Sequence, residues 1–66
     1  MSGYDFERLT AFIVEDNAFV RNTLADLLLH FGIKRISTLK NGEEAINLLK
    51  DMKRAHSPGP DIILTD

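Results

Sequence analysis

Acidic residues stand at two points of this 66-residue chain where an apolar segment ends. Glu15 and Asp16 follow the apolar run Ala11–Val14, and Asp66 comes about fifty residues later, after Ile62–Leu64 and one threonine. Carboxylates that come close together repel one another, and a hard cation such as Mg²⁺ relieves that repulsion with one or two of them as ligands. A further carboxylate beside the cation can attack a phosphoryl group as a nucleophile. These residue types therefore suit Mg²⁺-dependent phosphoryl transfer, if the fold brings them together.

Three short runs of the chain are typical of β-strands. The first, Leu9–Val14, contains four consecutive apolar residues beside an abrupt polar cluster, which favours a strand buried on both faces. The second, Ile36–Leu39, is half polar, as an edge strand would be. The third, Ile62–Leu64, is fully apolar, as though buried in the middle of a sheet.

Two helices are predicted between these strands. Asn17 can cap the first helix and Gly32 suits its end. We expect its apolar stripe, which has helical spacing, to face the sheet: Val20, Leu24, Leu27, Leu28 and Phe31. Glu43 and Glu44 favour the amino end of the second helix after the break at Asn41. Its apolar face would comprise Ala45, Ile46, Leu48, Leu49 and Met52.

The resulting β-α-β-α-β order predicts an α/β fold with a doubly wound parallel sheet and right-handed crossovers. The polarity of the strands suggests the order 2-1-3, with the two helices on opposite faces. Ligands of such sheets bind at the carboxyl ends of the strands, where the strand order reverses. That point lies between the first and third strands, so we expect Glu15, Asp16 and Asp66 to converge there.

Three sequence motifs, IVEDN, NGEEA and PDIILTD, resemble in order and position the receiver domain of two-component response regulators, a flavodoxin-like fold. The resemblance implies that Glu15, Asp16 and Asp66 hold Mg²⁺ and that Asp66 accepts phosphate, as an aspartyl phosphate, from a sensor histidine kinase or phosphotransfer protein. It further implies a cytoplasmic phosphorelay component that assists its own phosphotransfer and dephosphorylation, rather than a conventional enzyme. Glu15 stands where an Asp is commoner in the family, a change that keeps the charge.

The resemblance extends over residues 9–66, after a lead-in at 1–8, and corresponds to the first half of a receiver domain. Other family residues, a Ser or Thr ending the fourth strand and a Lys ending the fifth, would lie beyond Asp66. We therefore expect further strands and helices there, and we expect these 66 residues not to be self-sufficient. Otherwise Ile62–Leu64 would be an open apolar edge, through which the chain could associate with a second copy.

The composition of the chain argues against several other classes of function. The chain contains no Cys, which excludes disulfides and thiolate zinc sites and is compatible with a reducing cytoplasm. Its eight Lys and Arg residues do not cluster, so no nucleic-acid surface is expected, and no apolar run is long enough to cross a membrane. We interpret Arg21 as a solvent-facing charge and both His30 and His56 as surface residues.

Three alternatives to a phosphoacceptor remain. A pseudo-receiver would share the fold and signal without phosphate, and its altered residues would be found beyond Asp66. A phosphatase or another phosphotransferase with an Asp nucleophile usually carries Asp-x-Asp after the first strand, which the EDN tripeptide does not supply. A dinucleotide-binding domain would show G-x-G-x-x-G at that place, and the chain has none there.

Overall fold

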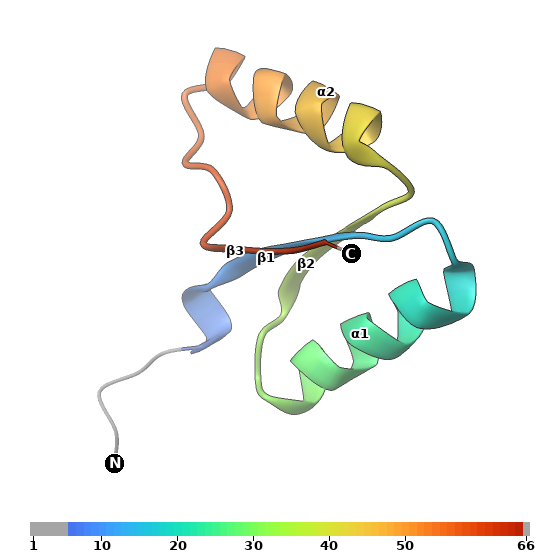
Figure 1. Ribbon diagram of the computed structural model, residues 1–66. Coiled ribbons are helices and arrows are strands. Elements are labelled where there is room, and N and C mark those ends of the chain that lie inside the picture. Colours follow the sequence, from blue (N-terminus) through green and yellow to red (C-terminus); the bar gives the residue numbers. More distant parts are fainter. Residues whose placement is uncertain (1–5, 66) are drawn as a thin grey trace.

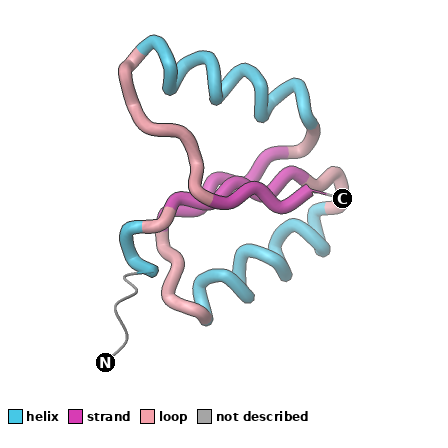
Figure 2. The backbone as a smooth tube through the Cα atoms, turned by 60° about the vertical axis from the view of Figure 1, so that its left-hand side comes forward, coloured by secondary structure: helices cyan, strands magenta, loops and turns pink. Residues whose placement is uncertain are grey.

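The computed structural model describes residues 6–65, which form a three-layer α/β arrangement. Its elements in chain order are η1 (Phe6–Arg8), β1 (Thr10–Val14), α1 (Ala18–His30), β2 (Arg35–Leu39), α2 (Gly42–Arg54) and β3 (Ile62–Thr65). The strands are parallel and lie in the order β2-β1-β3. α1 covers one face of this sheet and α2 the other (Figures 1 and 2). The predicted doubly wound sheet, its 2-1-3 order and its opposed helices are confirmed.

The three strands end level with one another. Val14, the last residue of β1, pairs with Leu39 on β2 and with Thr65 on β3. β2 lies at an edge, as its polarity predicted, and among the described residues β3 forms the other edge. The carboxyl ends of all three strands therefore form one side of the sheet (Figure 1).

Asp61 joins the start of β3 to the start of β1 through two hydrogen bonds with one residue. The Asp61 backbone N–H donates to the carbonyl oxygen of Thr10 at 2.8 Å, and Asp61 Oδ2 accepts from the Thr10 N–H at 2.9 Å. The regular pairing of the two strands begins at the next position, where Ala11 stands opposite Ile62. Because a slip of one residue would turn every β3 side chain to the other face, this contact helps to set the register of β3.

The core is built on β1, whose successive side chains point to opposite faces of the sheet. Ala11, Phe12 and Ile13 are almost completely buried, with 0–1% of their surface exposed. The cluster on the α1 face comprises Ala11, Ile13, Leu28 and Ile33. Phe12 belongs to the α2 face, where Ala45 is the buried residue of the helix. The central strand therefore supplies apolar surface to both helical layers.

The apolar stripe predicted for α1 is wrong in its rotational phase. Leu28 is buried and Leu24 packs against the core, but Leu27 is 50% exposed and Phe31 62% exposed. Val20 is also exposed. At 100° per residue the buried line of the helix, which includes Ala25 and Arg21, lies roughly 60° around the helix from the centre of the predicted stripe. Part of that stripe instead borders a groove of ≈430 Å³ between α1 and β3, lined by Val14, Glu15, Val20, Leu24, Leu64 and Thr65.

The second helix follows its prediction more closely. Ala45 is buried, and the half-buried residues of its inner face are Leu48, Leu49 and Met52. Ile46, which was assigned to the same face, is 55% exposed, so that assignment is wrong. Asn41 caps the helix by accepting a hydrogen bond from the Glu44 N–H at 2.9 Å. The Glu44 side chain reaches back to the Lys40 N–H at 2.8 Å and holds the β2–α2 loop against the helix start.

At the far end of α1 the chain turns sharply into β2. Gly32 has φ +96°, a left-handed conformation that side chains other than glycine rarely adopt, and the Gly32 N–H donates to the Leu29 carbonyl at 2.9 Å. Lys34 then forms an ion pair of 2.7 Å with Glu7 of η1. The hydrogen bond and the charge of Lys34 lower the pKa of Glu7, but solvent screens this exposed pair, so it contributes little stability.

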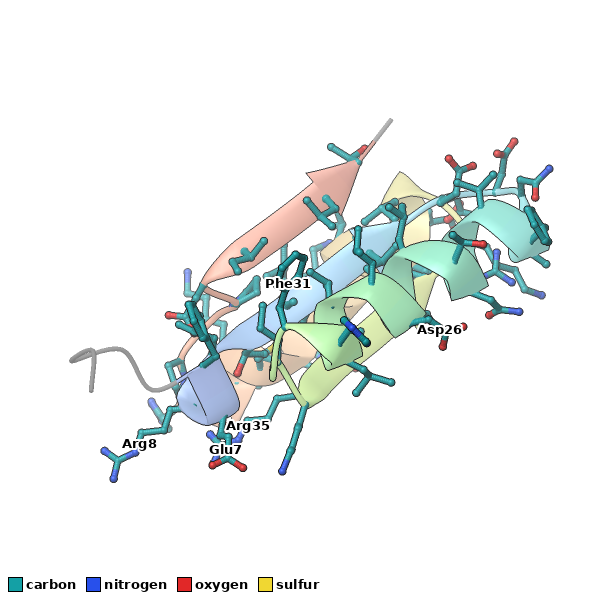
Figure 3. The ribbon with its side chains drawn as sticks, turned by 90° about the horizontal axis from the view of Figure 1, so that it is seen from below. Glu7, Arg8, Asp26, Phe31 and Arg35 are labelled. Carbon is teal, nitrogen blue, oxygen red and sulfur yellow. The ribbon has the colours of Figure 1, made fainter. Side chains whose placement is uncertain are left out.

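Glu7 and Arg35 lie together at the amino end of the sheet, away from the acidic loop after β1 (Figure 3). Neither helix within residues 6–65 has the length and apolar character that a membrane span requires.

The corrected phase of α1 predicts that two adjacent leucines differ in their contribution to stability. Leu28→Ala should lower the free energy of unfolding by about 2–5 kcal/mol because it opens a cavity in the core. Leu27→Ala, its matched control, should cost about 1 kcal/mol or less because the side chain is half exposed. Denaturant unfolding of the full protein measures both values, and equal costs would contradict the phase described here.

The contact between Asp61 and Thr10 predicts a difference between two variants of Asp61. Asp61→Ala should lower the free energy of unfolding by about 0.5–1.5 kcal/mol, because the Thr10 N–H loses its side-chain acceptor. Asp61→Asn keeps an oxygen acceptor and should retain most of that stability. Unfolding midpoints of the two variants decide the matter, and an Ala variant as stable as the wild type would show that the carboxylate is dispensable.

Candidate functional site

The acidic pair lies where the sequence placed it, at the carboxyl end of the central strand. Glu15 directly follows β1 and is partly exposed, and Asp16 is exposed. The Glu15 N–H donates to the carbonyl oxygen of Leu39 at 3.0 Å, so the end of β1 stays joined to the end of β2. β3 ends on the other side of β1 at Thr65, paired with Val14. The pair therefore follows the central strand at the end of the sheet where the strand order reverses.

A shallow cavity of ≈330 Å³ opens at this edge. The residues that line it come from all three strand ends and from the start of α2: Val14, Glu15, Asp16, Lys40, Asn41, Gly42 and Thr65. The lining is mostly polar and combines two carboxylates with one ammonium-bearing side chain. Sequence analysis did not single out Lys40, although its place directly after β2 was a usable signal, because parallel strands bring their carboxyl ends to one edge.

The loop between β1 and α1 is held by hydrogen bonds from its own residues. Glu15 Oε2 accepts from the Asn17 N–H at 3.0 Å, and Asn17 Oδ1 accepts from the Val20 N–H at 3.0 Å. Asn17 is therefore the cap of α1, as predicted. One oxygen of the Glu15 carboxylate faces the local backbone in this arrangement, which limits the directions that the other oxygen can take.

Arg21 also contacts this loop, and its interpretation as a solvent-facing charge is wrong. The side chain is partly buried, and its Nη1 donates to the carbonyl oxygen of Glu15 at 2.8 Å. The same nitrogen lies 3.5 Å from the carbonyl oxygen of Asp16. The position of Arg21 on the inward side of α1 follows from the phase of the helix, so the error in the apolar stripe also concealed this contact.

The donor set at this edge fits a hard cation. Glu15 and Asp16 offer carboxylate oxygens, the ligands that Mg²⁺ takes, and neither thiolate nor imidazole lines the cavity. Within residues 6–65 no group of three or more His, Cys, Asp or Glu side chains is arranged to hold a metal ion. Asp66, the third predicted ligand and the predicted phosphoacceptor, lies outside the described residues, and it follows Thr65 directly in the chain. The three-carboxylate site therefore stays a prediction.

The two histidines take no part in this edge of the sheet. His30 is the last residue of α1, and His56 lies in the loop after α2. Both are exposed, which agrees with their interpretation as surface residues. His56 has φ +55°, an uncommon conformation for a residue other than glycine, at the point where the chain leaves α2.

One curated protein is similar to most of this chain. A protein-glutamate methylesterase/protein-glutamine glutaminase of Archaeoglobus fulgidus is 37% identical over 54 residues, which are 82% of this chain and 14% of that protein. No family model matches the chain, and no solved structure matches it significantly. Since the similarity covers so small a part of the relative, the methylesterase and glutaminase activities are properties of that protein. The strand order, two opposed helices and this similarity together support a receiver-like segment of the flavodoxin type.

Proposed function

We propose that this chain is the phosphoacceptor part of a two-component signalling protein and that Asp66 receives the phosphoryl group. The observation that carries the proposal is the acidic pair at the end of β1, level with the end of β3, where the next residue is Asp66. The phosphoryl donor would be a sensor histidine kinase or a phosphotransfer protein. The protein would act in the cytoplasm, where such donors are found.

The proposed reaction is a transfer between two side chains. A carboxylate oxygen of Asp66 attacks the phosphorus of a phosphohistidine, an aspartyl phosphate forms, and the bond between phosphorus and the imidazole nitrogen breaks. Mg²⁺ would neutralise the charge on the phosphoryl oxygens when bound. Glu15 and Asp16 would hold it from the end of β1, and Asp66 would supply a further oxygen. This chain's own contribution would be to bring the acids that follow two strands to one edge.

The acidic pair suits this work because of its surroundings. Asp16 is exposed and Glu15 partly exposed, so a cation reaches them without the desolvation cost that a buried site imposes. The cavity beside them is open and polar, which leaves room for the waters that Mg²⁺ retains. Lys40 on the cavity wall adds a positive charge that favours an anionic group such as a phosphoryl.

The first test is the site of phosphorylation. The full protein incubated with acetyl phosphate and Mg²⁺ should gain one phosphoryl group by intact mass, and Asp66→Asn should gain none because it lacks the nucleophile. Asp51→Asn, an exposed carboxylate on α2, is the matched control and should be labelled like the wild type. Labelling that persists in Asp66→Asn would refute the assignment. A wild-type protein that takes no label from any donor would instead favour the pseudo-receiver.

The second test concerns the metal. Asp16→Asn should raise the dissociation constant for Mg²⁺ on the order of tenfold or more, since even groups that only orient a metal ligand are worth that much. It should hardly change the unfolding midpoint, because it removes one of two neighbouring like charges at an exposed position. Asp26→Asn is the control, since Asp26 projects from α1 into solvent (Figure 3). Equal Mg²⁺ affinities of wild type and Asp16→Asn, measured by calorimetry, would show that Asp16 is not a ligand.

A further inference from the structure

The guanidinium group of Arg21 joins the first turn of α1 to the backbone of both candidate metal ligands. Its Nη1 lies 2.8 Å from the Glu15 carbonyl oxygen and 3.5 Å from that of Asp16. The backbone of Arg21 is itself fixed, because its N–H donates to the Asn17 carbonyl at 2.9 Å. One side chain thus connects a helix that packs on the sheet core with the acidic loop.

Two observations indicate that this contact is more than a surface charge pair. The hydrogen bond to Glu15 is partly buried, so solvent competes with it less than with an exposed bond. It also ends on a backbone carbonyl rather than on a carboxylate, so it restrains the path of the chain and leaves both acidic side chains available. Among the described residues, other hydrogen bonds of this loop join Glu15 to Asn17 and to Leu39, and Asn17 to Val20.

We propose that Arg21 is a positioning residue, which fixes the backbone of Glu15 and Asp16 so that their carboxylates meet at the candidate Mg²⁺ site. The part that concerns the metal rests on the proposed function. The part that concerns the loop rests on the hydrogen bonds alone. Arg21 contacts no substrate or metal in this proposal and acts through the residues that do.

The sign of the effect on Mg²⁺ binding separates this role from a simple electrostatic one. A guanidinium charge beside the site repels a cation. If Arg21 acted only through this charge, its removal would therefore tighten Mg²⁺ binding. If Arg21 instead fixes the loop, its removal would weaken Mg²⁺ binding, because the two carboxylates would no longer be held in place. The two explanations therefore predict changes of opposite direction in the same measurement.

The test compares Arg21→Met with Arg35→Met in the full protein. Arg35 is exposed at the amino end of β2, the opposite end of the sheet, so its variant loses the same charge without touching the loop (Figure 3). Titration calorimetry with Mg²⁺ should give a dissociation constant on the order of tenfold higher for Arg21→Met. The constant should be nearly unchanged for Arg35→Met. Arg21→Lys should recover most of the affinity, since an ammonium group also carries several N–H donors.

A second measurement needs no metal. Arg21→Met should speed hydrogen exchange at the Glu15 amide, which donates to Leu39, while the Ile33 amide, which donates to Leu28, should exchange as in the wild type. If Arg21→Met proves to be unfolded, Arg21→Gln replaces it, because that side chain keeps a polar group in the partly buried position but is too short to reach as far as the guanidinium Nη1. Unchanged exchange at Glu15, or Mg²⁺ binding that is unchanged or tighter, would overturn the proposal. A wild-type protein that binds no Mg²⁺ would refute the proposed function, and the exchange rates would still decide whether Arg21 fixes the loop.

Discussion

The burial of β1 between two strands and two helices is the constraint on which the other elements depend. β1 is the strand that pairs with both neighbours, and its residues Ala11, Phe12 and Ile13 are almost fully enclosed. A parallel strand can be joined to the next only by a crossover, so each helix must return over one face of the sheet. Crossovers of parallel strands share one hand, and the chain moves along the sheet in one direction from β1 to β2 and in the other from β2 to β3, so α1 and α2 lie on opposite faces. The carboxyl ends of the strands then share one edge, and the acidic pair is carried there because it directly follows the central strand.

The strands and their order could be predicted from the sequence because the polarity of each strand indicates how deeply it is buried. The four apolar residues before Glu15 have no polar face to turn to water, which requires a central strand, and the hydroxyl groups of Ser37 and Thr38 suit an edge. The phase of α1 could not be predicted in the same way. Its apolar residues occupy more than half of the helix circumference, so their pattern does not indicate which part of that surface faces the sheet. Leu27 and Phe31 lie outside the covered part.

The residues of the candidate site also differ in whether the sequence alone predicts their place. The place of Glu15 and Asp16 follows from the strand pattern, and the cap formed by Asn17 follows from a local preference of helix ends. Lys40 was missed, although the predicted strand order already placed the end of β2 at this edge. The contact of Arg21 with the loop carbonyls requires the orientation of the helix. Tertiary contacts of this kind leave no periodic trace in the sequence. Asp66 was assigned from its place after the third predicted strand and from the motif that contains it, and its role is decided by the phosphorylation experiment.

The double contact between Asp61 and Thr10 joins residues that are 51 positions apart in the chain. The pairing of β1 with β2 closes a much shorter segment, since Thr10 stands opposite Arg35. Closing a longer loop costs more chain entropy, and non-local strand pairing is the slow part of folding in sheets of this kind. We therefore expect the β1-α1-β2 unit to assemble first and β3 to dock onto a surface that already exists. The acidic loop would then be formed before its partner strand arrives, so the function of the edge would be acquired only when β3 docks.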